Sequence, residues 1–188
     1  MTLADALALV VPELRDEVAV HANGHLSRAV CAARDRAECF YMIGSMGLAA
    51  SIGLGIALVQ PRRRVLVFDG DGNVLMNPGA LASIAAAAPA NLLHLCFDNG
   101  VHASTGAQPT ISGQVRLDEL ARAAGYRWVG RVETAAALAA ELPHFLGCEG
   151  PAFLLVRVAL DTAPPGPRVP HAPDAMTARL RRALGVAP

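Results

Sequence analysis

The sequence predicts an α/β fold: a single-domain parallel sheet of about six strands with helices on both faces. Short runs that are apolar throughout alternate along the chain with segments of helical periodicity. Uninterrupted apolar runs are typical of strands covered on both sides, as in parallel sheets. The 188 residues can form one well-buried core and leave no room for a second full domain.

The elements of the first half can be placed from capping residues, helical spacing and β-branched runs. Thr2 and Asp5 have the spacing of an N-cap and an acidic residue in the first turn, so a helix is expected from there to Pro12. The strands expected next lie over residues 17–22, over 39–43 and from Val65 onward. The helices expected between them are Leu26 to Ala33 and an alanine- and glycine-rich helix that ends at Val59, with Arg62 to Arg64 capping its C-terminus and facing water.

The second half continues the alternation. Its expected helices are one opened by Asn77-Pro78, one from Leu117 to Ala124 and one from Thr134 to Leu146. Its expected strands are one leading into Asp98, one from Tyr126 to Val129 and one from Ala152 to Val158. We therefore divide the chain into a domain over residues 1–160 and a proline-rich tail over 161–188, in which Asp174 to Leu184 is expected to form a terminal helix.

Composition excludes several classes of partner. Lys+Arg and Asp+Glu number 16 each, so no excess of positive charge favours nucleic acid or an anionic membrane. The four cysteines are scattered without a CxxC pair, as expected of buried thiols in a reducing compartment. The N-terminus has no basic segment before its apolar residues, and a cytoplasmic protein is therefore expected.

Four polar turns are expected at the carboxyl ends of strands, where open α/β sheets bind ligands. They cover residues 23–25, 44–47, 70–73 and 98–101. Gly70 and Gly72 allow a phosphate to approach the backbone, and Asp71 beside a diphosphate would need a cation such as Mg²⁺ between them. Asn99 offers a second oxygen at the next strand end. Tight turns without a ligand are the alternative, whereas an EF-hand is excluded because Val74 replaces its glycine.

The segment GDGN at residues 70–73, followed by Asn99, resembles the motif of thiamine diphosphate enzymes. The phrases FYMIGSMGLAASIGLGIAL, NLLHLCFDNGVHASTGAQPT and NGHLSR are similar to the phosphonopyruvate and sulfopyruvate decarboxylases. The resemblance implies a thiamine diphosphate-binding fold in which residues 1–160 are the diphosphate-binding domain. Its cofactors would be thiamine diphosphate and Mg²⁺.

The resemblance also assigns roles to matching positions. It implies Mg²⁺ ligation by Asp71, Asn99 and the Val101 carbonyl. The cofactor would be contacted by Gly24, His25, Gly44, Ser45, Met46, Asp71, Gly72, Asn73 and Asn99, with Met46 as the apolar wedge that keeps it bent. The substrate would face His102, Ser104 and Thr105, although these residues also suit a loop held by its own hydroxyl groups. Many members of the family have asparagine where this chain has Asp98.

One functional group of this family has no counterpart in the sequence. Thiamine enzymes activate the cofactor with a glutamate of a pyrimidine-binding domain, and no glutamate here lies in a matching motif. We therefore expect the β-type subunit of a hetero-oligomeric carbon–carbon lyase that decarboxylates a phosphonopyruvate- or sulfopyruvate-like 2-oxoacid to an aldehyde. A partner subunit would supply the glutamate. An acetolactate synthase-like or acyloin-forming enzyme and a non-catalytic cofactor-binding partner remain the alternatives, and Arg28, His102 and Arg116 do not discriminate between acid groups on the substrate.

Overall fold

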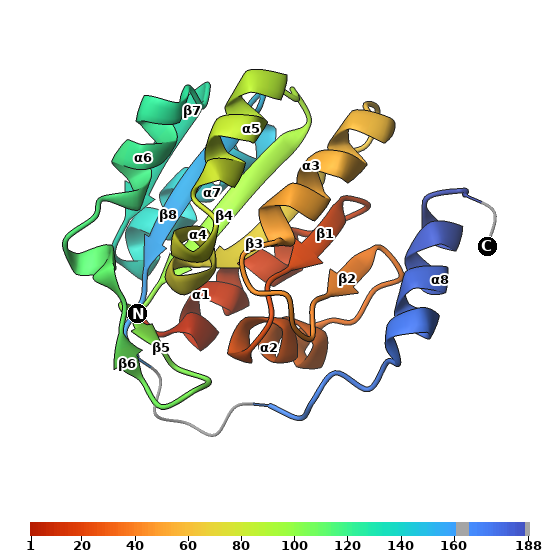
Figure 1. The fold of residues 1–188 in the computed structure, drawn as a ribbon, viewed down its shortest axis with the longest axis horizontal. Helices are drawn as coiled ribbons and strands as arrows, with labels where there is room; N and C mark the ends of the chain where they lie inside the picture. Colours follow the sequence, from red (N-terminus) through yellow and green to blue (C-terminus); the bar gives the residue numbers. More distant parts are fainter. Residues whose placement is uncertain (161–165, 187–188) are drawn as a thin grey trace.

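The computed structural model describes residues 1–160 and 166–186, and it confirms the predicted parallel sheet (Figure 1). Six strands are paired in the order β2-β1-β3-β4-β8-β7, and every pairing is parallel. The central strands are buried along nearly their whole length. The strands are β1 (Val18–His21), β2 (Cys39–Tyr41), β3 (Val65–Gly70), β4 (Leu92–Asp98), β7 (Trp128–Val132) and β8 (Ala152–Arg157).

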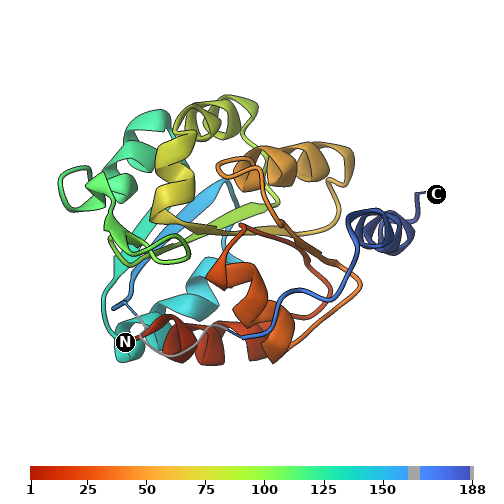
Figure 2. The same ribbon diagram turned by 60° about the horizontal axis from the view of Figure 1, so that its bottom comes forward.

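Helices cover both faces of the sheet, as predicted (Figure 2). One face carries α1 (Leu3–Val10), α2 (His25–Ala33) and α7 (Ala135–Gly147), with the short 3-10 helix η1 (Val11–Glu13) after α1. The other face carries α3 (Ala49–Val59), α4 (Asp71–Met76), α5 (Gly79–Ala87) and α6 (Leu117–Ala124). The layers thus enclose the apolar strands on both sides.

The terminal helix α8 (Pro173–Ala183) lies beside β2, at one edge of the sheet (Figure 1). Its Met176 is 2% exposed, and the Tyr41 amide donates to the Met176 sulfur at 3.1 Å. An edge strand has unpaired backbone groups that could pair with another chain, and α8 covers part of this edge. The helix confirms the prediction within one residue at each end, while residues 161–165 of the tail lie outside the described residues.

The predicted capping signals are confirmed at two helices. Thr2 and Asp5 form a reciprocal capping box at α1, with the Asp5 carboxylate accepting from the Thr2 amide at 2.8 Å. Helix α6 has the predicted bounds, and Gly125 follows it with φ of 106°. The Tyr126 amide then donates to the Ala121 carbonyl, which completes the helix cap. Because Tyr126 belongs to this cap, β7 begins at Trp128, and the predicted strand from Tyr126 was placed too early.

Two other predictions need correction. β2 ends at Tyr41, and Ile43 is 63% exposed where a buried strand residue was expected. The connection from β3 to β4 contains α4 and α5 instead of one helix. Asn77 has φ of −144° and interrupts the helical path, because the residue before a proline is disfavoured in the helical region. The turn Gly-Asp-Gly is consequently the first turn of a helix of its own.

Two of the arginines predicted to cap α3, Arg63 and Arg64, donate to the ends of other helices. Arg63 donates to the Ala183 carbonyl at 2.6 Å, at the end of α8, and Arg64 donates to the Cys148 carbonyl at 2.7 Å, just after α7. Terminal carbonyls of a helix lack backbone partners, so these guanidinium groups satisfy helix ends that the sequence could not indicate. The sequence thus predicted correctly that arginines here cap helix ends, but it did not predict which helices they cap.

The cysteines agree with the sequence prediction. All four are free, with Cys39 and Cys96 buried and Cys31 and Cys148 half-buried. Burial raises the pKa of the Cys96 thiol, with the Asp69 carboxylate as a further cause. Across residues 1–160 and 166–186, no helix has the length and apolar character needed to cross a bilayer.

Candidate functional site

The two predicted anchors lie at neighbouring strand ends. β3 and β4 pair in register with Gly70 opposite Phe97, so Asp71 and Asn99 follow directly from adjacent strands. A cavity of about 140 Å³ opens at this edge of the sheet. Of the predicted site residues, those that line it are Gly24, His25, Met46, Asp71, Gly72, Asn73, Asn99, Val101, His102, Ser104 and Thr105. The structure therefore brings together residues from 24 to 105 of the chain.

Asp71 is a buried carboxylate suited to a cation. It is 3% exposed, and the Thr110 hydroxyl donates to its Oδ2 at 2.5 Å. Burial raises the pKa of the Asp71 carboxyl and the Asp98 carboxylate raises it further, while the Thr110 hydrogen bond opposes these effects. A divalent cation beside Asp71 would favour the charged carboxylate and so offset the effects of burial and of Asp98. Hard oxygen donors such as this carboxylate are the ligands that Mg²⁺ prefers.

The other two predicted metal ligands lie in the turn after β4. The Asn99 side-chain oxygen accepts from the Val101 amide at 3.0 Å, which fixes the orientation of the side chain. An amide oxygen has two lone pairs, so this bond leaves one for another donor or a cation. Val101 lines the same cavity. The ligand set is thus compatible with one cation beside Asp71.

Two glycines at the cavity fit a ligand that approaches the backbone. Gly24, the N-cap of α2, has φ of 93°, and a Cβ there would lie 3.2 Å from the Ser104 hydroxyl oxygen. A Cβ on Gly72 would lie 2.8 Å from the His102 ring and 3.0 Å from the Met46 methyl group. Side chains at these positions would collide with Ser104, His102 or Met46, so glycine is needed for the close packing at this end of the cavity. The free amides at the start of α2 favour an anion.

The turn after β2 is tied to α4 by an asparagine. The Gly47 amide donates to Asn73 Oδ1 at 3.0 Å, and the Asn77 side chain donates to the Gly47 carbonyl at 3.2 Å. Asn73 thus uses one lone pair of its side-chain oxygen to hold this turn, and its NH₂ group and second lone pair remain for other partners. Met46 lines the cavity, whereas Gly44 and Ser45 are exposed and lie outside its lining.

A small antiparallel hairpin, which the sequence did not predict, carries the three predicted substrate-facing residues. It consists of β5 (Val101–His102) and β6 (Gln108–Pro109). The Thr105 hydroxyl lies 3.2 Å from the His102 carbonyl and 3.0 Å from the Gln108 side-chain oxygen. Thr105 is therefore held by its own hairpin, as the structural alternative proposed, although it also lines the cavity.

Sequence reasoning did not assign roles to several residues of this site. Asn23 lines the cavity, and its buried Oδ1 has no hydrogen-bond partner among the described residues. Asp69 also lines the cavity and is 1% exposed, with its Oδ2 3.2 Å from His94 Nε2. His94 in turn lies 3.2 Å from the Tyr126 hydroxyl. Asn23 could have been found from its polar turn, but the contact from Asp69 to His94 requires the paired strands.

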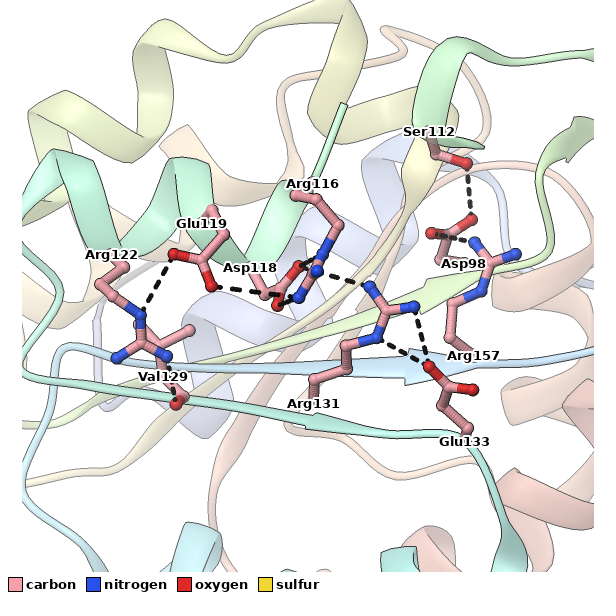
Figure 3. Close-up of polar contacts among 10 residues, drawn as sticks. All are labelled: Asp98, Ser112, Arg116, Asp118, Glu119, Arg122, Val129, Arg131, Glu133 and Arg157. Atoms are coloured by element: carbon pink, nitrogen blue, oxygen red, sulfur yellow. Dashed lines mark hydrogen bonds and ion pairs between the residues drawn. The ribbon is translucent and has the colours of Figure 1, made fainter. Parts of the chain in front are cut away.

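The two arginines considered for substrate binding are engaged elsewhere. Arg28 donates to the Gly166 carbonyl at 2.7 Å. Arg116 donates twice to Asp118, at 3.0 and 2.5 Å (Figure 3). Neither residue lines the cavity. Groups at the cavity that can donate to an anion include the amides at the start of α2 and the side chains of His102 and Ser104.

Fold and site together define a cofactor-binding α/β domain, and comparison with known proteins identifies its family. Residues 24–156 match the family described as thiamine pyrophosphate enzyme, C-terminal TPP binding domain. The match covers more than half of the chain, and the chain belongs to this family. The resemblance found in its motifs is thereby confirmed.

Several relatives carry names that refine the comparison. The chain is 47% identical over 150 residues to a phosphonopyruvate decarboxylase of Streptomyces viridochromogenes, with 79% of this chain and 38% of the relative aligned. It is 37% identical over 187 residues to a sulfopyruvate decarboxylase of Methanosarcina acetivorans, aligning 97% of this chain and 47% of the relative. The chain thus spans less than half the length of these two proteins.

A third relative is similar to this chain in extent. The sulfopyruvate decarboxylase subunit beta of Methanothermobacter thermautotrophicus is 41% identical over 144 residues, which cover 75% of this chain and 77% of the relative. Among solved structures, the thiamine diphosphate-dependent 4-hydroxybenzoylformate decarboxylase of Rhodococcus jostii superposes with a TM-score of 0.68 at 20% identity. That alignment covers 87% of this chain and 33% of the other, and it supports the fold alone.

Proposed function

We propose that this chain is the diphosphate-binding part of a thiamine diphosphate-dependent 2-oxoacid decarboxylase. The observation that carries the proposal is the buried Asp71 carboxylate beside Asn99, at adjacent strand ends and next to a cavity bordered by Gly24 and Gly72. In this proposal Asp71, Asn99 and the Val101 carbonyl hold Mg²⁺. The ion connects the acidic strand ends to the diphosphate, which would otherwise be repelled by them.

The remaining residues of the cavity orient the ligands. The backbone at Gly24 and Gly72 approaches the diphosphate, and the amides at the start of α2 donate to it. Met46 provides an apolar surface for the rest of the cofactor, beside the exposed Gly44 and Ser45. When bound, thiamine diphosphate supplies the electron sink that accepts the electrons left by CO2.

The proposed substrate is a 2-oxoacid with a second anionic group, of the phosphonopyruvate or sulfopyruvate type. The names of the relatives favour this class over acyloin-forming substrates. On this chain, His102 and Ser104 of the hairpin are placed to donate hydrogen bonds to the acid groups, since both line the cavity. Thr105 would act by keeping the hairpin in shape.

We further propose that a pyrimidine-binding domain on a partner completes the site. Within the described part of the chain, no glutamate lines the cavity, although a glutamate activates the cofactor in enzymes of this type. Three relatives of similar extent are named as subunit beta, which supports a hetero-oligomer. The exposed position of Gly44 and Ser45 leaves them accessible to such a partner.

The proposal is tested by release of CO2 from phosphonopyruvate and sulfopyruvate. The chain is purified with its partner and assayed with thiamine diphosphate and Mg²⁺, and turnover of one of the two acids is expected. Asp71→Ala should abolish Mg²⁺-dependent cofactor binding in calorimetry, because it removes the charged ligand. Unchanged cofactor affinity in Asp71→Ala would remove the metal assignment, and no turnover of either acid would remove the substrate class.

A further inference from the structure

Asp98, the last residue of β4, is 2% exposed, and both of its carboxylate oxygens have polar partners. Its Oδ1 accepts from the Gly100 amide at 3.0 Å and from the Ser112 hydroxyl at 2.8 Å. Its Oδ2 forms an ion pair with Arg157, the last residue of β8 (Figure 3). The two residues are opposite each other in the register of β4 and β8. Asp98 thus connects two strand ends and the turn that contains Asn99.

A continuous series of polar contacts leads from Asp98 to Asp71. Ser112 belongs to the short 3-10 helix η2 (Ile111–Gly113), and its backbone amide donates to the Thr110 hydroxyl oxygen at 3.4 Å. The Thr110 hydroxyl donates to Asp71 Oδ2 at 2.5 Å. The Thr110 amide also donates to the Gly100 carbonyl at 2.8 Å. One network therefore reaches the side chain of Asp71 and the backbone of Gly100, the residue that follows Asn99.

We propose that Asp98, with Arg157 as its counterion, is a positioning residue for the cation site and is not itself a metal ligand. This inference rests on the proposed function, because it concerns the same Mg²⁺ site. Asp98 orients both proposed side-chain ligands, Asn99 through the Gly100 amide and Asp71 through Ser112 and Thr110. Groups that orient metal ligands in this way commonly contribute 10- to 100-fold to metal affinity.

The contacts of Asp98 distinguish it from Asp71. Three donors, one of them a guanidinium cation, already occupy the Asp98 carboxylate, so a second cation there would displace Arg157. Asp71, in contrast, interacts with neutral donors, chiefly the Thr110 hydroxyl, and has no described ion pair. Arg157 neutralises the Asp98 carboxylate, whereas an asparagine at this position would have no charge to neutralise. The pair therefore allows an aspartate at this position without an unbalanced charge beside Asp71.

A neighbouring buried aspartate offers a matched control. Asp118 is 3% exposed and pairs with Arg116 at 2.5 Å and with Arg131 at 3.6 Å, but no described contact connects it to Asp71 (Figure 3). Asp98→Asn and Asp118→Asn both remove a buried negative charge and break arginine ion pairs, although Arg116 and Arg131 keep Glu119 and Glu133 as partners. Both variants should therefore lower the melting temperature. Only Asp98→Asn should weaken the cation site.

The experiment is calorimetric titration of thiamine diphosphate at several Mg²⁺ concentrations, on the chain purified with its partner. We expect Asp98→Asn to raise the Mg²⁺ concentration for half-maximal binding by about 10-fold or more, and Asp118→Asn to change it by less than about twofold. Ser112→Ala alters no charge, and it is the second variant to use if Asp98→Asn does not fold. It should also raise the Mg²⁺ concentration for half-maximal binding.

The outcomes separate this inference from the proposed function. Wild-type protein that binds thiamine diphosphate without needing Mg²⁺, or does not bind it, would overturn the proposed function together with this inference. Mg²⁺-dependent binding in the wild type that Asp98→Asn and Ser112→Ala leave unchanged would overturn the inference alone. Equal weakening by Asp98→Asn and Asp118→Asn would also overturn it, because that result would reflect general destabilisation.

Discussion

His21 is a fully buried histidine in the middle of an aromatic row. Its ring lies 5.0 Å from that of Tyr41 and 4.6 Å from that of Phe68, and neither ring nitrogen has a partner among the described residues. Burial lowers the pKa of His21 to about 3, and the positive charge of Arg36 contributes. The folded protein therefore keeps this side chain neutral at pH values where the unfolded chain binds a proton.

This difference makes stability depend on pH. Between the unfolded pKa of about 6.5 and the folded pKa of about 3, protonation favours the unfolded chain, so stability falls as the pH falls through this window. The contribution is up to about 1.4 kcal/mol per pH unit. In urea unfolding at pH 7.5, 6 and 5, His21→Leu should lose less stability on acidification than the wild type. The exposed His144→Gln serves as the control, and a pH slope in His21→Leu equal to that of the wild type would contradict this explanation.

Gly72 is the residue whose missing side chain most directly shapes the site. Because a Cβ there would lie 2.8 Å from the His102 ring, Gly72→Ala should displace the hairpin and weaken Mg²⁺-dependent cofactor binding by about 10-fold. Gly79→Ala is the control, since its Cβ would meet only Asn77 at 3.8 Å. Calorimetry compares the two variants. Equal affinities would mean that the close contact of Gly72 with the His102 ring is not required for cofactor binding.

At the scale of elements, α3 contains two glycines with opposite environments. A Cβ on Gly53 would lie 2.3 Å from Val67 of β3, whereas a Cβ on Gly55 would meet no atom within 4 Å. The sheet therefore approaches this alanine- and glycine-rich helix closely at Gly53. Gly53 thus serves the packing of α3 on β3, whereas Gly55 has no such role.

The two glycines should respond oppositely to the same substitution. Gly53→Ala should lower the free energy of unfolding by about 1–3 kcal/mol, because the helix must move away from β3. Gly55→Ala should raise it by about 0.5–1 kcal/mol, since alanine is the better helix former at an open position. Chemical denaturation of both variants gives the comparison. A stabilising effect of Gly53→Ala would show that the contact with Val67 relaxes without cost.

Elements were predictable where a local signal sets them. The capping box of α1 and the glycine after α6 act within a few residues. Helix α6 begins and ends as expected, and α1 begins as expected but ends at Val10, where a 3-10 turn replaces the predicted helix up to Pro12. The break at Asn77-Pro78 was visible too, but the helix before it was not, because six residues give too short a pattern. The hairpin β5–β6 escaped detection for the same reason.

At the scale of the whole molecule, the proposed site is incomplete without a partner. We expect the purified chain alone to release no CO2 from phosphonopyruvate or sulfopyruvate at saturating cofactor, because no described cavity residue is a glutamate. Adding the pyrimidine-binding partner should restore turnover, measured as CO2 release. Turnover by the chain alone at the rate of the complex would show that the activating group lies on this chain.

The sequence by itself determined the class of fold and the position of the two proposed anchors at one edge of the sheet. Uninterrupted apolar strands require cover on both faces, which implies a parallel sheet, and that sheet places Asp71 and Asn99 at one edge. Only the tertiary structure decided how these anchors are held. Arg157 meets Asp98 because β8 pairs with β4, and Thr110 reaches Asp71 from beyond the hairpin. Such contacts join residues 39 and 59 positions apart, and no local pattern in the chain records which distant strands become neighbours.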